Sequence, residues 1–178
     1  RALRPELALE EANAVAEAFD PGAPVPLYLP YLYRDLAKPG LSGAFLGLAP
    51  EHTWRDLLRS VYEGVAFAHR LQLDRLARAG LDREALVLSG GAANAPLWRQ
   101  LFADVLGKPV ILTREREAGA LGAAMAAAVC GGLYPRVEDA AKAMVRWEAL
   151  VRPRPHPAYE AKYERFLQKV GERDWTWD

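Results

Sequence analysis

A glycine pair that follows an apolar run is the strongest candidate site in this sequence. Residues 86–94 read Leu-Val-Leu-Ser-Gly-Gly-Ala-Ala-Asn, so a strand-like run stops at Gly90 and Gly91. Glycine lets a ligand approach the main chain closely, and free N–H groups near the next helix N-terminus attract phosphate. The alternative is a tight turn needed only for packing, with Asn94 capping the following helix. A nucleotide site and a structural turn are both open from these residues alone.

Two familiar chemistries do not fit this turn. The third glycine of the dinucleotide fingerprint G-x-G-x-x-G is absent. Ser89 does not sit in a nucleophile elbow and has no obvious histidine or acidic partner. We therefore assign Ser89 no catalytic role and expect no catalytic residue at this turn.

Two further segments could carry function. Residues 117–126 are almost entirely Ala and Gly, and Gly119 and Gly122 each cost a helix about 1 kcal/mol relative to Ala. This segment is either a plain buried helix or a mobile contact surface. Glu63 lies on a long helical pattern, where a carboxylate is usually solvated or held by its neighbours rather than catalytic. His52 and His69 are expected to be structural.

The elements that must position these residues alternate in the second half of the chain. We expect a buried strand at residues 85–89, a helix at 96–106 ended by Gly107, and a second strand at 109–113. Strand, helix, strand in this order predicts parallel pairing and an α/β class. Further helices are predicted at residues 119–129, 137–145 and 158–170.

The first half has a different pattern. A short helix is expected at residues 5–18, followed at 24–47 by short extended pieces that prolines interrupt. A long amphipathic helix up to Gly80 is expected next, with Thr53 as its N-cap. Its apolar face is predicted to carry Trp54, Leu58, Val61, Val65 and Ala68.

Composition restricts the class of protein. The 178 residues are 51% hydrophobic and 26% charged, and 23 basic residues balance 23 acidic ones. This neutral balance, without a basic stripe, argues against nucleic acid as a partner. The single Cys130 excludes an internal disulfide framework and favours a reducing, cytoplasmic location.

No membrane segment is expected, because the longest apolar run, residues 123–130, is far shorter than the roughly 20 residues a spanning helix needs. The chain begins with Arg1 rather than Met. We therefore expect it to be a piece of a longer protein, and a piece need not hold a whole active site.

Four segments together resemble the C-terminal domain of the FGGY carbohydrate kinases. Residues 43–48 and 56–63, separated by seven residues, are similar to the second signature of that family. Residues 27–33 resemble its aromatic segment, 88–100 its adenosine motif, and 117–124 its connecting helix. The order and spacing of these motifs make the resemblance more specific than any single one.

The resemblance implies the C-terminal half of an actin-like, ribonuclease-H-like ATPase fold, without the first strands of that domain. The whole of residues 1–178 would form this nucleotide-binding domain of a two-domain kinase. Gly90 and Gly91 would lie against the phosphates and ribose of ATP, and Ala92 and Asn94 near the adenosine. The helix at residues 119–128 would be a hinge that moves against the other domain.

Residues 63–69 look most like those of xylulose and L-xylulose kinases. The resemblance thus implies a sugar kinase that uses ATP and Mg²⁺ to phosphorylate a ketopentose. In this family the catalytic base is an Asp of the N-terminal domain, which no residue of this chain matches, so the chain alone is expected to be inactive. The alternatives are a non-catalytic nucleotide-binding or regulatory module, or a structural fragment that forms a homodimer.

Overall fold

A long central helix, α2 (Trp54–Arg78), organises the fold, and its start is capped as predicted. The computed structural model describes residues 8–18, 20–32, 41–115 and 117–171. The Thr53 hydroxyl accepts the Arg55 N–H at 3.3 Å, and the Asp56 carboxylate accepts the Thr53 N–H at 2.7 Å. This reciprocal pairing satisfies donors that every helix N-terminus otherwise leaves free.

The apolar face predicted for α2 does not coincide with the side of the helix that is buried. The stripe from Trp54 to Ala68 is only partly buried. The buried positions are Arg59, Ser60, Tyr62, Glu63, Gly64, Ala66, Phe67 and Leu71. Helix α2 is packed by β1, α1, α3 and α6, so it is covered on several sides. Hydrophobic periodicity assumes one covered side and cannot detect buried charges that are paired.

The proline-rich segment forms a two-stranded antiparallel sheet that packs on α2. Strands β1 (Leu27–Leu29) and β2 (Ala44–Leu46) pair with Tyr28 opposite Phe45. Strand β1 crosses α2 at Gly64, where an added Cβ atom would lie 2.3 Å from the Tyr28 carbonyl oxygen. Only glycine permits this approach of strand to helix.

The second sheet contains β3 (Leu86–Leu88), β4 (Val110–Thr113) and β5 (Trp147–Val151), in the order β3-β4-β5. Strands β3 and β4 are parallel, as predicted, and helix α3 (Pro96–Leu106) connects them and ends at Gly107 with φ of 64°. Strand β5, antiparallel to β4, was not predicted, because its residues are mostly exposed and show no alternation. The expectation that β3 is buried is wrong: Val87 is 56% exposed at the sheet edge.

Two further helices, α1 and α6, pack against this core. Together with α2, α3 and the two sheets they form the body of the molecule. Helix α1 (Leu9–Glu17) packs on α2, where the Tyr62 hydroxyl donates to Asn13 at 2.6 Å. Helix α6 (Pro157–Val170) covers another side and buries Tyr159, Tyr163, Phe166 and Val170. Phe166 lies 5.9 Å from Phe67 of α2, ring centre to ring centre. The start of the predicted helix at residues 5–7 lies outside the described residues.

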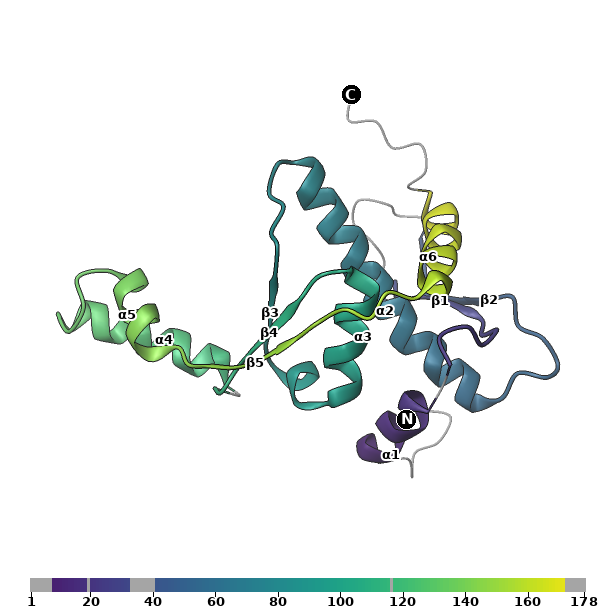
Figure 1. Cartoon of the computed structure of the whole chain (residues 1–178), viewed down its shortest axis with the longest axis horizontal. Coiled ribbons are helices and arrows are strands. Elements are labelled where there is room, and N and C mark those ends of the chain that lie inside the picture. The colour runs from purple at the N-terminus through teal and green to yellow at the C-terminus, as the bar shows by residue number, and fades with distance from the viewer. Residues whose placement is uncertain (1–7, 19, 33–40, 116, 172–178) are drawn as a thin grey trace.

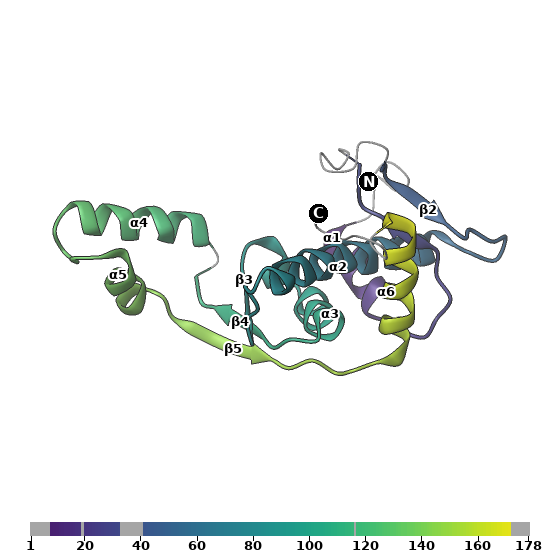
Figure 2. The ribbon, with the colours of Figure 1, turned by 90° about the horizontal axis from the view of Figure 1, so that it is seen from above.

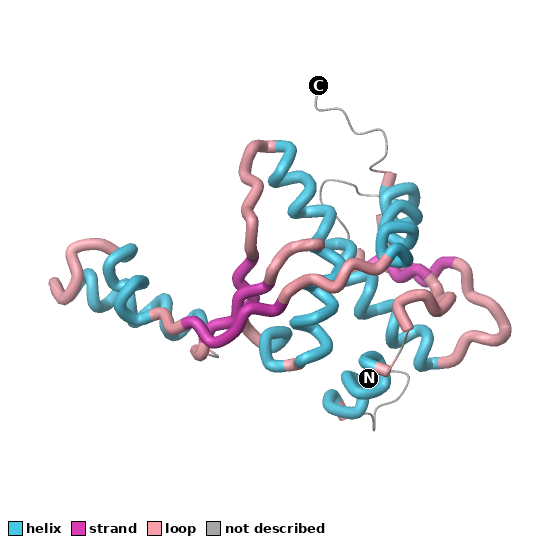
Figure 3. The backbone as a smooth tube through the Cα atoms, in the orientation of Figure 1, coloured by secondary structure: helices cyan, strands magenta, loops and turns pink. Residues whose placement is uncertain are grey.

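Helices α4 (Ala118–Cys130) and α5 (Val137–Met144) form an arm that projects from this body (Figures 1 and 2). Figure 3 shows β4 and β5 running side by side toward the arm, and the Arg114 N–H donates to the Arg146 carbonyl at 2.9 Å beyond them. No residue of α4 is buried. Of the two hypotheses for this helix, the plain buried helix is therefore wrong.

Candidate functional site

The turn after β3 is held in a conformation that requires glycine. Gly90 has φ of 78° and ψ of −162°, a region that residues with a side chain rarely adopt. Residues Gly91–Asn94 then form a single 3₁₀ turn, in which the Ala93 N–H donates to the Gly90 carbonyl at 3.0 Å. The Arg99 guanidinium of α3 donates to the Ala93 carbonyl at 2.5 Å. The turn is thereby fixed to both the strand and the helix that flank it.

Gly91 differs from Gly90, because the structure does not require glycine at this position. Its φ is not in the left-handed region, and an added Cβ atom would meet nothing within 4 Å. Gly90, Gly91 and Asn94 are all exposed, so the main chain of the turn is open to a ligand. The positive φ accounts for Gly90, whereas neither main-chain conformation nor packing within the described residues accounts for Gly91.

The alternative in which Asn94 caps the next helix is wrong. The N-cap of α3 is Ala95, and no side chain caps this helix. Asn94 is the last residue of the 3₁₀ turn, and its side chain makes no hydrogen bond with any described residue. Pro96 is the first residue of α3 and has no N–H, so the main-chain donors of the first turn begin at Leu97.

An apolar groove of about 450 Å³ adjoins this turn. Ser89 and Ala92 line its near end, and Val65, His69, Trp98 and Phe102 are among the residues that form its walls. No Asp, Glu, Lys or Arg is among its lining residues. The lining of the groove is therefore mostly apolar and uncharged, and His69, Gln72 and Ser89 are its polar residues.

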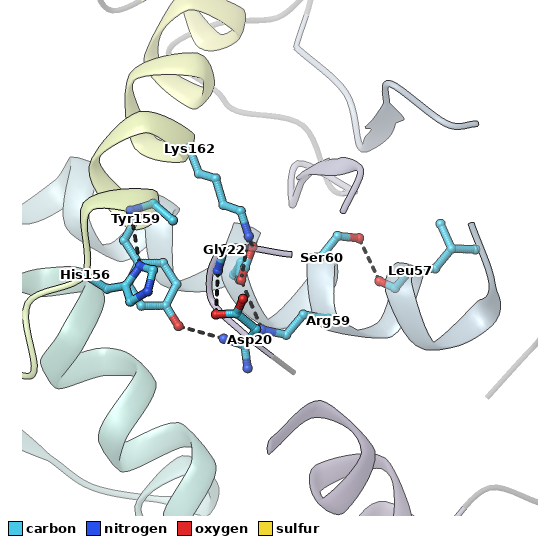
Figure 4. A network of polar contacts seen from close by, with 10 residues as sticks. Asp20, Gly22, Leu57, Arg59, Ser60, His156, Tyr159 and Lys162 are labelled. Carbon is cyan, nitrogen blue, oxygen red and sulfur yellow. Dashed lines mark hydrogen bonds and ion pairs between the residues drawn. The ribbon is translucent and has the colours of Figure 1, made fainter. Parts of the chain in front are cut away.

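Glu63 belongs to a buried polar network between α2 and α6. Figure 4 labels three other residues of this network, Arg59, Tyr159 and Lys162. Glu63 is 2% exposed and accepts from the Arg59 guanidinium at 3.0 Å and from the Lys162 ammonium at 2.9 Å. Arg59 also donates to the Tyr159 hydroxyl at 2.6 Å, and burial raises the pKa of Tyr159 to about 12. A carboxylate enclosed by two cations is held by its neighbours, as expected, and is not positioned to abstract a proton from a ligand.

Sequence reasoning missed the partners of Glu63. The four-residue spacing of Arg59 and Glu63 on one helix could have indicated that pair. Lys162 and Tyr159 are almost a hundred residues away in the chain, and nothing in their local pattern marks them as partners.

The two histidines of α2 and its preceding loop have structural contacts. The ring Nδ1 of His52 accepts the Ala49 N–H at 2.9 Å. The ring of His69 lies 2.9 Å from the Val65 carbonyl and edge-on to Phe102. Within the described residues, no group of three or more His, Cys, Asp or Glu side chains could hold a metal ion, and no helix is long and apolar enough to cross a membrane.

A mixed sheet against which α3 packs, with a strand that ends in a glycine turn before this helix, defines an α/β domain. The sequence model described as "FGGY family of carbohydrate kinases, C-terminal domain" matches residues 2–130. The chain belongs to this family. Beyond the matched residues, β5 pairs with β4 and α6 packs on α2.

Comparisons with individual proteins agree with this family. The chain is 31% identical over 168 residues to the L-xylulose/3-keto-L-gulonate kinase of Escherichia coli. These residues are 93% of this chain and 34% of the relative. The crystal structure of xylulose kinase from Rhodospirillum rubrum is similar over 96% of this chain and 36% of its own, with 31% identity and a TM-score of 0.79. The chain thus spans about a third of the length of these relatives.

A more distant structure confirms the fold alone. Gluconate kinase from Lactobacillus acidophilus is similar over 94% of this chain and 34% of its own, with 23% identity and a TM-score of 0.75. The expected fold class, part of an actin-like ATPase fold, is confirmed by these neighbours.

Proposed function

We propose that the parent polypeptide is an ATP-dependent sugar kinase that transfers the γ-phosphoryl group to a hydroxyl of a ketopentose such as xylulose. The family and the xylulose kinases among its relatives support this proposal. Residues 1–178 are its nucleotide-binding C-terminal domain, and ATP or ADP and the pentulose are its ligands. The remaining domain of the parent supplies the catalytic base.

The turn at residues 90–94 is the part of the nucleotide site that this chain contributes. Gly90 and Gly91 lie against the phosphates and ribose, and Ala92 and Asn94 lie near the adenosine. The observation that carries this assignment is Gly91, which has open space around it and no conformational need to be glycine. A ligand that rests on the main chain at this position accounts for the missing side chain.

The described residues offer no group of three acidic, His or Cys side chains for a metal, so they do not form a Mg²⁺ cage of their own. Mg²⁺ prefers phosphate oxygens and water, and it therefore enters with the nucleotide. Phosphoryl transfer depends mainly on positioning and charge neutralisation. The turn contributes positioning, and α4 is the hinge that moves against the other domain.

Steady-state kinetics of the parent polypeptide test this function. D-xylulose, L-xylulose, gluconate and glycerol are compared as acceptors, and phosphorylation of a xylulose is expected to have the highest kcat/KM. Gly91→Val is expected to raise the KM for ATP at least about 10-fold and to leave the KM for the sugar unchanged. The matched control is Ala77→Val, which introduces the same side chain at an exposed site of α2.

Two outcomes would contradict the proposal. If a folded parent polypeptide phosphorylates none of these acceptors, the proposed sugar kinase activity is excluded. A Gly91→Val variant with an unchanged KM for ATP would exclude the turn as the nucleotide site.

A further inference from the structure

Arg99 of α3 holds the glycine turn at two carbonyls. Its side-chain Nε donates to the Ala93 carbonyl at 2.5 Å, and its main-chain N–H donates to the Ala95 carbonyl at 3.2 Å. The first bond joins residues six positions apart, so it is not part of the regular ladder of α3. Arg99 thus connects the helix back to the 3₁₀ turn that precedes it.

The turn has few other hydrogen bonds to hold its shape. Its own are the Ala93 N–H to the Gly90 carbonyl at 3.0 Å and the Ala95 N–H to the Ala92 carbonyl at 3.4 Å. Hydrogen bonds of this 3₁₀ type have poorer geometry than those of an α-helix. Among the described residues, no other side chain forms a hydrogen bond with the main chain of residues 90–95. This guanidinium is therefore the side chain that fixes the main chain of the turn.

Arg99 has no competing role within the part of the chain that the structure describes. It is partly buried, and no Asp or Glu carboxylate in that part forms an ion pair with it. A guanidinium that is removed from water is normally paired with a carboxylate, which accepts charge-assisted hydrogen bonds. The acceptor here is a carbonyl of the turn, so the contact that accounts for this guanidinium is the turn itself.

We propose that Arg99 is a positioning residue for the nucleotide. By holding the Ala93 carbonyl, it keeps the exposed main chain of Gly90 and Gly91 in the shape that the nucleotide contacts. This inference rests on the proposed function, in which residues 90–94 form the nucleotide site. A turn that is already ordered loses less conformational entropy when a ligand binds, so the Arg99 bond raises the affinity without touching the ligand.

Two substitutions of Arg99 separate its hydrogen bond from its charge. In Arg99→Gln, the Nε2 donor lies as many bonds from Cα as the arginine Nε, so the hydrogen bond is kept and the charge is lost. In Arg99→Met, a methyl group takes that position and both are lost. In titration calorimetry of the parent polypeptide with Mg²⁺–ADP, we expect Arg99→Met to raise Kd about 10-fold and Arg99→Gln to stay within about 3-fold of the wild type. Equal losses in the two variants would assign the effect to charge and overturn the proposal.

Arg83→Met is the matched control. The Arg83 guanidinium also donates to a main-chain carbonyl, that of Asp82 at 2.9 Å, but it lies before the start of β3 rather than after its end. This variant should leave the Kd for Mg²⁺–ADP unchanged. A rise in Kd as large as that of Arg99→Met would show that the effect is not specific to the turn and would overturn the proposal.

A double-mutant cycle with Gly91→Val tests whether Arg99 acts through the turn. If both residues act on the same main chain, the variant with Gly91→Val and Arg99→Met should bind Mg²⁺–ADP within about 3-fold of the weaker single variant. Losses that multiply would show that the two residues act independently, which would overturn the proposal.

Kinetics on the same samples keep this inference apart from the proposed function. Arg99→Met should raise the KM for ATP and leave kcat and the KM for the sugar unchanged. A parent that shows the expected pattern of Kd values but phosphorylates no acceptor contradicts only the proposed sugar kinase activity. An active kinase whose Kd for Mg²⁺–ADP is the same in the wild type and in Arg99→Met contradicts only the role of Arg99.

Discussion

Helices α2 and α4 both carry glycine in their interiors, yet the two regions use it differently. In α2, Gly64 lets β1 approach so closely that no side chain would fit between them. In α4, an added Cβ at Gly119 or Gly122 would meet nothing within 4 Å, and no residue of the helix is buried. Glycine in a helix interior costs about 1 kcal/mol relative to Ala. Packing offsets that cost in the body, whereas within the described residues nothing offsets it in the arm.

The body and the arm also differ in how far the side chains of their ion pairs are buried. In the body, Glu63 is enclosed with Arg59 and Lys162, and all three side chains are at most 14% exposed. In the arm, Arg136 and Glu138 form a pair at 3.1 Å with side chains 71% and 57% exposed. Water competes fully for the second pair and hardly at all for the first, so similar distances carry very different energies.

The largest expected effect comes from removing the buried carboxylate. Glu63→Ala removes the carboxylate that pairs with buried Arg59 and partly buried Lys162, and we expect it to lower the free energy of unfolding by about 3–5 kcal/mol. Lys162→Met should cost less, because Arg59 still pairs with Glu63. Urea unfolding of each variant measures both values.

Glu138→Ala in the arm is the control for that experiment. Its pair is exposed, so the change should stay within about 0.5 kcal/mol. A loss for Glu63→Ala no larger than that of Glu138→Ala would show that the buried network does not stabilise the body.

The next effect concerns the close approach of β1 to α2. Gly64→Ala forces the Tyr28 main chain away from the helix, and overpacking of this kind costs about 1–3 kcal/mol. Thermal unfolding should show a lower Tm. An unchanged Tm would mean that β1 is not held against α2 at this residue.

The matching substitution in the arm should have the opposite sign. Gly122→Ala meets no atom within 4 Å and improves helix propensity, so we expect stabilisation of α4 by up to about 1 kcal/mol. Slower amide exchange in α4 is the measurement. Faster exchange in this variant would indicate that Gly122 is already in close contact with another surface.

The smallest effect is electrostatic and depends on pH. The two terminal guanidinium nitrogens of Arg70 donate to the Glu160 carboxylate at 2.8 and 2.7 Å. These hydrogen bonds hold the pKa of that carboxyl below its ordinary value of 4.5. A lowered pKa in the folded state contributes stability above the unfolded pKa, and this contribution is lost as the pH falls through the folded pKa.

We therefore expect Glu160→Gln to lower stability at pH 7 by roughly 0.5 kcal/mol or less, since the side chain is 65% exposed, and to have no effect once the pH lies below the folded-state pKa of Glu160. Glu148→Gln on β5 is the control, because Glu148 is exposed and away from Arg70. Denaturant midpoints at several pH values give the comparison, and an effect that persists in acid would contradict this assignment.

Local sequence signals predicted the local elements well. The Thr53 cap, the end of α3 at Gly107 and the parallel pair of β3 and β4 are confirmed, because each depends on neighbouring residues or on the order of adjacent elements. The glycine turn was located correctly as a strand-to-helix turn. Its proposed role in binding nucleotide stays a prediction.

The features that escaped prediction depend on distant parts of the chain. Strand β5 forms only because β4 offers it an edge, and its exposed residues show no pattern of their own. The buried face of α2 is set by four elements packed around it and includes charges whose partners are far away. The exposure of β3 likewise follows from its place at the edge of the sheet, which residues 86–88 cannot encode.

The most direct test of the nucleotide turn is an NMR titration of this chain with Mg²⁺–ATP to several millimolar, with backbone amides assigned. The account predicts weak binding, with the largest shift changes at residues 89–94 and in the first turn of α3, reduced by Gly91→Val and by Asn94→Ala but not by Ala77→Val. Shift changes centred on α4, on α6 or on no particular region, or changes that Gly91→Val leaves unaltered, would contradict it.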